Sequence, residues 1–122
     1  EDNDYFTKCR NMRLRLYQIN NSYHFHEKKS SGSASFKTNK EKDYAYFLAG
    51  WHGQWSKFYY HKKYNGYFSA LKICLPNLLV NIIQLILNFP INLKKTKYIY
   101  FKIEGLLTSI IGISSYKRSK FD

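Results

Sequence analysis

The sequence predicts a mainly α-helical α/β chain, in which one short helix and two β-strands are followed by a longer helical region. Three observations predict this order. Apolar and polar residues alternate between residues 13 and 26, as they do in half-buried strands. Aromatic residues recur at steps of three and four after residue 44, as on one face of a helix. An uncharged, largely apolar stretch then runs from residue 73 to residue 93.

The first part of the chain, residues 1–43, contains the short helix and both strands. Residues 2–12 are predicted to be helical, because apolar residues recur at helical spacing and acidic residues at the start suit the positive end of the helix dipole. Residues 13–19 and 22–26 are the two predicted strands, separated by an Asn-Asn turn. We expect the polar stretch from residue 27 to residue 43 to form a loop.

The second part, residues 44–122, is predicted to be a helical extension. Its first helix, residues 44–64, carries one aromatic stripe: Tyr44, Phe47, Trp51, Trp55 and Phe58. Gly50 and Gly53 in this helix predict the close approach of another element. Asn65-Gly66 predicts a break, after which helix resumes as far as Pro76. A last helix over residues 95–111 is predicted to stop at Gly112, and the basic tail beyond residue 113 is expected to fray.

The uncharged stretch from residue 73 to residue 93 is long enough to raise the question of a membrane span. Pro76 is expected to start a helix whose body is residues 77–89, and Pro90 follows it. Between the two prolines a helix measures only about 20 Å at about 1.5 Å per residue. Because the hydrocarbon core of a bilayer is about 30 Å thick, the sequence predicts a buried or interfacial helix.

Charge is the strongest compositional signal. The 122 residues hold twenty Lys and Arg against eight Asp and Glu, which gives a net charge of +12. No acidic residue lies between Ala45 and Ile103. This balance predicts attraction to an anionic surface, although a solvated basic face is the simpler alternative. We expect Lys94, Lys95 and Lys97 to face a membrane.

Composition also bears on nucleic-acid binding and on the state of the two cysteines. Lysines and twelve tyrosines would suit a single-stranded nucleic acid, but the aromatic residues follow a helix, where core packing explains them, so we expect no nucleic-acid partner. Cys9 and Cys74 lie far apart and form no metal or redox motif. Free, buried thiols of a reducing compartment are the expected state.

The first ten residues, EDNDYFTKCR, resemble the Glu-Asp-x-Asp-aromatic segment late in the catalytic domain of family 2 glycosyltransferases, which are inverting enzymes of the GT-A type. In that family a strand and then a strand ending in His follow, and here that residue is His26. The stretch WHGQWSKFYYHKKY from Trp51 is similar to the aromatic, basic helix in the extension of bacterial rhamnosyltransferase-like members. GLLTSIIG, from Gly105, is similar to their Gly-Leu tail.

The resemblance implies that residues 1–43 are the C-terminal end of a GT-A nucleotide-sugar transferase domain and that residues 44–122 form a basic, membrane-facing extension. The reaction would transfer a sugar from a nucleotide-sugar donor to a cell-envelope polysaccharide or a lipid-linked saccharide acceptor. The enzyme would be cytoplasmic and peripheral on the inner face of the cell membrane. The Asp-x-Asp metal motif would lie upstream, so this part of the enzyme is expected to be inactive by itself.

The same resemblance implies roles for individual residues. Asp2 would be the general base that deprotonates the acceptor hydroxyl, with Glu1 beside it. His26 would complete the coordination of a Mg²⁺ or Mn²⁺ ion whose main carboxylate ligands lie upstream. The ion would neutralise the departing diphosphate. Residues expected near the diphosphate or the acceptor are Lys28, Lys29, Ser30 and Ser31.

Each of these assignments has a plainer alternative. Glu1 and Asp2 could only cap a helix, and a His-x-His pair such as His24 and His26 is more often structural than a metal site. For the chain as a whole, the alternative to an enzyme is a non-enzymatic basic module that binds a membrane surface or a partner subunit.

Overall fold

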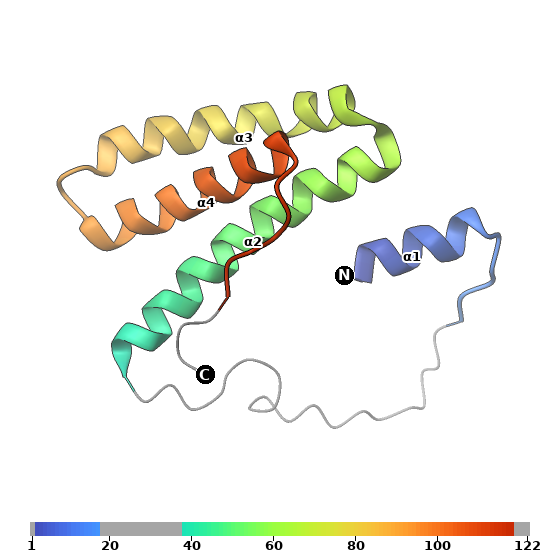
Figure 1. The fold of residues 1–122 in the computed structure, drawn as a ribbon, viewed down its shortest axis with the longest axis horizontal. Helices are drawn as coiled ribbons and strands as arrows, with labels where there is room; N and C mark the ends of the chain where they lie inside the picture. Colours follow the sequence, from blue (N-terminus) through green and yellow to red (C-terminus); the bar gives the residue numbers. More distant parts are fainter. Residues whose placement is uncertain (1, 18–37, 119–122) are drawn as a thin grey trace. The chain divides into compact units, whose positions relative to one another are not determined.

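The computed structural model describes residues 2–17 and 38–118 (Figure 1). The chain divides into two compact units, Glu1–Ser35 and Phe36–Asp122, and each unit is described by itself. The first unit contains α1 (Asp2–Asn11). The second contains α2 (Asn39–Asn65), α3 (Tyr67–Asn88) and α4 (Leu93–Ile111).

The predicted N-terminal helix is confirmed as α1. Asp4 and Lys8 form an ion pair one turn apart, at 3.2 Å, and Lys8 and Arg10 lie in the last turn, where cations suit the helix dipole. The helix ends at Asn11, and Arg13, two residues further on, has a φ of 55°. The Leu14 N–H donates to the Cys9 carbonyl at 2.9 Å, which closes the left-handed turn typical of helix C-termini.

The prediction of an α/β fold with two strands is wrong for the described residues, which contain four helices and no strand. Residues 14–17 have no regular structure, and the Leu14 and Leu16 side chains are half exposed. Alternation produces a strand only where another strand pairs with the backbone and a second layer covers the apolar face. The described residues supply neither. The second predicted strand, residues 22–26, lies outside the described residues.

The long second helix starts earlier than predicted, inside the expected loop. Thr38 caps α2, because its side-chain oxygen accepts a hydrogen bond from the Glu41 N–H at 3.2 Å. The helix ends at Gly66, which has a φ of 81° and whose N–H donates to the Lys62 carbonyl. The break predicted at Asn65-Gly66 is therefore confirmed.

The third helix is longer than the sequence predicted, and the comparison of its length with the thickness of a bilayer changes. α3 runs through Pro76 without interruption, so Pro76 does not start a new helix. Its ring removes one helical hydrogen bond, to the carbonyl four residues earlier, but Pro76 lies on the exposed side of the helix, where that carbonyl can be solvated. The 22 residues of α3 span about 33 Å at about 1.5 Å per residue. The helix is long enough to cross a bilayer.

The last helix matches its prediction closely. Asn92 caps α4 by accepting a hydrogen bond from the Lys95 N–H at 3.0 Å. The helix ends at Gly112, which adopts the left-handed conformation with a φ of 90°. Gly112 therefore has the terminating role that the sequence predicted.

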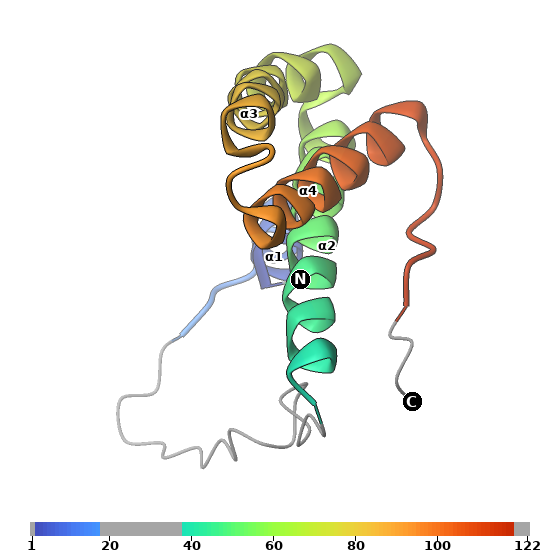
Figure 2. The same cartoon turned by 90° about the vertical axis from the view of Figure 1, so that its left-hand side faces the viewer.

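Each of α2, α3 and α4 packs against the other two (Figures 1 and 2). The predicted aromatic stripe faces this core. One cluster of buried residues holds Phe47, Trp51 and Phe101, and a second holds Phe58, Ala70, Cys74, Leu78 and Leu106. The close approach predicted at Gly50 is confirmed, because a Cβ there would lie 2.6 Å from the Tyr98 ring. At Gly53 the prediction is wrong, since nothing lies within 4 Å.

The described part of the C-terminal tail, residues 113–118, is anchored and not frayed. The Trp55 indole donates to the Ile113 carbonyl at 3.0 Å. His52 contacts the Ser115 hydroxyl through Nδ1 and the Lys117 carbonyl through Nε2, both at 3.1 Å. Since a carbonyl only accepts, Nε2 carries the proton and donates. This Ser–His pair therefore fastens the tail to α2.

Candidate functional site

The residues predicted to carry catalysis fall mostly outside the described part of the chain. Asp2 is the first residue of α1, a position that a helix-capping or dipole-stabilising acid also occupies. The other candidates lie outside the described residues: Glu1, His26, Lys28, Lys29, Ser30 and Ser31. Their roles remain predictions. In residues 2–17 and 38–118, no group of three or more His, Cys, Asp or Glu side chains is placed to hold a metal ion.

The most unusual feature of the described residues is a large exposed apolar surface on α3. The helix buries only one side, formed by Ala70, Cys74, Leu78 and Asn81, against α2 and α4. Its opposite side exposes large apolar side chains. We call these five the α3 apolar surface: Phe68, Leu79, Ile83, Ile86 and Leu87, which are between 53% and 79% exposed.

This surface is larger than scattered exposed residues would produce. α3 is long and apolar enough to cross a membrane, and within the described residues it is the one helix of that kind. Only 22% of its most apolar 18-residue window is buried. The exposed series continues beyond the helix through Phe89, Ile91 and Leu93, which are 65% to 85% exposed. Contiguous apolar surfaces of this kind mark contacts with a membrane or with another protein.

Cations lie beside the end of this surface. Lys94, Lys95 and Lys97, the residues predicted to face a membrane, are all exposed in the first turns of α4, and the first turn contains no acidic residue. Lys94 forms an ion pair with Asp43 of α2 at 2.5 Å. The Lys97 ammonium lies 5.5 Å from the centre of the Phe47 ring. Part of the positive charge is therefore already engaged within the protein.

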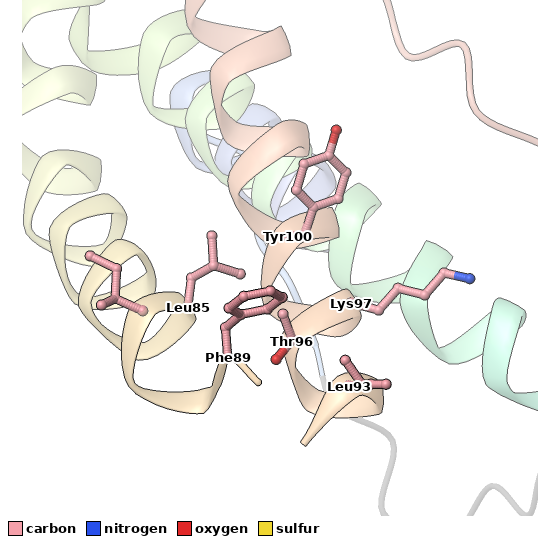
Figure 3. Close-up of a pocket in the computed structure, with 7 residues that line it drawn as sticks. Leu85, Phe89, Leu93, Thr96, Lys97 and Tyr100 are labelled. Carbon is pink, nitrogen blue, oxygen red and sulfur yellow. The ribbon is translucent and has the colours of Figure 1, made fainter. Parts of the chain in front are cut away.

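A groove lies between the end of α3 and the start of α4 (Figure 3). Its volume is about 690 Å³, and its walls include Leu85 and Phe89 from one side and Leu93 and Tyr100 from the other. This groove was not predicted from the sequence. The available signal was the pair of apolar residues, Phe89 and Leu93, on either side of the short connection.

Three residues of the α2–α4 unit and its tail have shifted pKa values. Burial raises the pKa of the Cys74 thiol, and the Lys57 charge opposes this effect. Burial and the Tyr46 hydroxyl raise the pKa of Tyr98. The hydrogen bond to Glu104 raises the pKa of Tyr116. These shifts keep protons on structural side chains and identify no acid–base pair beside the apolar surface.

No protein family, curated protein or solved structure matches this chain. The likeness to family 2 glycosyltransferases therefore rests on the residues quoted above, and sugar transfer remains a prediction.

Proposed function

We propose that the helical unit α2–α4 attaches this protein to an anionic membrane surface, and that the protein transfers a sugar from a nucleotide-sugar donor to a saccharide or lipid-linked acceptor there. The observation that carries the attachment is the α3 apolar surface with lysines beside its end. Sugar transfer is supported by the first ten residues of the sequence, EDNDYFTKCR.

The two kinds of contact are energetically complementary. Full burial of one large aliphatic side chain contributes about 1.5–3 kcal/mol, and the α3 apolar surface offers five large apolar side chains. Each Lys near an anionic leaflet adds about 1 kcal/mol, and this part is screened by salt. Together they favour stable attachment of a helix lying in the interface.

An interfacial position suits the packing better than a spanning one, even though α3 is long enough to span. α3 packs along its length against α2 and α4. Those helices carry Lys57, and Lys102 and Glu104 near the middle of α4. A spanning α3 would place such charges near the bilayer centre, at about 2.5–3.5 kcal/mol each. Peripheral attachment to the anionic inner leaflet avoids this cost.

In the proposed reaction, Asp2 takes the proton of the acceptor hydroxyl as that oxygen attacks the anomeric carbon of the donor sugar, and the nucleoside diphosphate leaves. A Mg²⁺ or Mn²⁺ ion would neutralise the leaving group. Residues 2–17 and 38–118 contain no group of side chains fit to hold that ion, so its ligands would have to lie outside this part of the chain. Membrane attachment would place the enzyme where a lipid-linked acceptor resides.

The second candidate is a non-enzymatic module that uses the same surface to bind a membrane or a partner subunit. The α3 apolar surface favours it equally. Enzyme activity of the full-length protein separates the two. Incubation with a panel of nucleotide sugars and a membrane extract should release nucleoside diphosphate if sugar transfer occurs, and no release with any donor would leave the non-enzymatic module.

Vesicle flotation tests the attachment itself. The protein should float with vesicles of phosphatidylglycerol at low salt, be partly released at high salt, and be fully released only in detergent, because apolar insertion is not screened. Absence of flotation at low salt, with the helices intact by circular dichroism, would contradict membrane attachment and leave a protein partner for the α3 apolar surface.

A further inference from the structure

The groove at the end of α3 has the dimensions and walls of a ligand site. Its volume of about 690 Å³ lies inside the range of roughly 300–1,000 Å³ that is usual for such sites. Leu85 and Ile86 line it from α3, and Leu93 and Tyr100 line it from α4. Figure 3 shows the Phe89 ring between the end of α3 and the start of α4, where it lines the groove.

The groove offers almost no polar partner to an occupant. The Thr96 hydroxyl donates to the Asn92 carbonyl at 2.9 Å and lies 3.2 Å from the Asn88 carbonyl, so its proton is used by the backbone. The Tyr100 hydroxyl points away from Phe89 and Leu93 (Figure 3). Burial of apolar surface is therefore what would hold an occupant.

The groove is open, and it opens toward apolar surroundings. Ile86 and Leu93 in its walls are 67% and 70% exposed. Ile86 also belongs to the α3 apolar surface, so the groove continues that surface toward α4. A compact ligand would leave this connection unused, whereas a flexible chain could lie in the groove and extend along the surface.

The charged residues around the groove favour a negatively charged group on the occupant. Of the seven residues that line it, Lys97 is the one with a charged side chain. Its stem borders the hollow and its ammonium lies on the side of α2, over the Phe47 ring. Lys94 and Lys95 precede it in the same turn, which has no acidic residue. An anionic group is favoured at this end.

We propose that the groove binds one alkyl chain of an anionic membrane lipid, with the lipid phosphate at Lys97. This inference rests on the proposed membrane attachment and makes it specific. The apolar chain uses the walls from Leu85 to Tyr100, and the phosphate uses the ammonium that borders them. Lys97 can turn toward the phosphate because its four-carbon stem is flexible.

A soluble single-chain probe tests the site without a membrane. Decyl phosphate, kept below its critical micelle concentration, should bind the protein saturably with one site per chain in isothermal titration calorimetry. Decyl maltoside, with the same chain and no charge, should bind at least about tenfold more weakly, and inorganic phosphate should not bind measurably. Equal affinity for the two decyl compounds would overturn the assigned phosphate position, and no saturable binding of either would overturn the site.

Two pairs of variants locate the binding. Leu93→Trp fills the groove from an exposed position and should abolish decyl phosphate binding, whereas Leu79→Trp, on the α3 apolar surface outside the groove, should not. Lys97→Gln should weaken binding about tenfold, whereas Lys62→Gln, which removes the same charge in the last turn of α2, should not. Equal effects within either pair would overturn the proposal, with circular dichroism as the check on folding.

Flotation of the same variants separates this inference from the proposed function. Leu93→Trp should still float with phosphatidylglycerol vesicles, because the α3 apolar surface is unchanged. Flotation of the wild type without any decyl phosphate binding would overturn the groove and leave membrane attachment standing. Decyl phosphate binding without flotation would support the groove and contradict attachment.

Discussion

A Cβ atom on Gly105 would lie only 2.3 Å from the backbone carbonyl oxygen of Trp51. α4 and α2 therefore cross backbone against backbone at this point, where Trp51 is completely buried. One turn further along α4, the Ser109 hydroxyl donates to the Trp55 carbonyl at 3.0 Å. This crossing fixes α4 on α2, and both helices support the buried side of α3.

The first prediction concerns this crossing. Gly105→Ala should lower the free energy of unfolding by about 1–3 kcal/mol, because the added methyl group meets backbone that cannot move aside. Gly53→Ala is the matched control in α2, since nothing lies within 4 Å of that position. The control should gain about 0.5–1 kcal/mol from helix propensity. Urea unfolding followed by circular dichroism measures both, and equal stability of the two variants would contradict the close crossing.

The second prediction concerns the tail. Glu104 accepts hydrogen bonds from the Tyr116 hydroxyl at 3.0 Å and from Lys117 at 2.5 Å. Glu104→Gln should loosen the tail, and trypsin should cleave after Lys117 several-fold faster, because cleavage follows local opening. Asp43→Asn is the control, since it removes an acid that pairs with Lys94 and not with the tail. Equal cleavage rates in the two variants would show that Glu104 does not hold the tail.

The third prediction separates the apolar contribution to membrane attachment from the electrostatic contribution. Leu79→Ser, Ile83→Ser and Leu87→Ser together should leave the fold intact, because all three side chains are more than half exposed. If each removes about 1 kcal/mol of apolar transfer free energy, partitioning at high salt weakens about 10²-fold. Changing Lys94, Lys95 and Lys97 to Gln should instead remove the salt-sensitive part of binding. Vesicle flotation across a salt series measures both contributions. If the two variants lose the same fraction of bound protein at every salt concentration, the apolar and electrostatic contributions are not carried by these two sets of residues.

The sequence predicted the helical unit well where spacing and packing agree. The aromatic stripe from Tyr44 to Phe58 has one possible use on a helix, which is to face a core, and it does so. Gly66 and Gly112 end helices as predicted, because their positive φ values favour glycine. Local signals of this kind do not depend on distant parts of the chain.

The failures depend on tertiary context. Leu14 and Leu16 alternate with polar residues, but alternation cannot reveal whether a partner strand exists. Pro76 looks like a helix start, yet the packing of Ala70, Cys74 and Leu78 on one side of α3 carries the helix through it. The groove needs two helices to be folded beside each other, so no single stretch of sequence encodes it.

The fourth prediction concerns catalysis in the full-length protein. Asp2→Asn should lower turnover by about 10²-fold or more, the usual scale for a lost general base, with little change in donor binding. His26→Ala should raise the metal concentration needed for activity, whereas His24→Ala should not. Release of nucleoside diphosphate measures turnover. Near-normal turnover of Asp2→Asn would return Asp2 to a helix-capping role, and unchanged metal dependence of His26→Ala would remove its role as a ligand.

A fluorescent label at two sites measures whether the α3 apolar surface lies against the membrane. In a Cys9→Ser, Cys74→Ala background, Ile83→Cys places an environment-sensitive dye on this surface, and Gly53→Cys places it on an open part of α2. With phosphatidylglycerol vesicles, the dye at position 83 should shift to the blue and lose its accessibility to aqueous iodide, while the dye at position 53 should change little. Equal iodide accessibility at both positions on bound protein would show that the α3 apolar surface does not lie against the membrane.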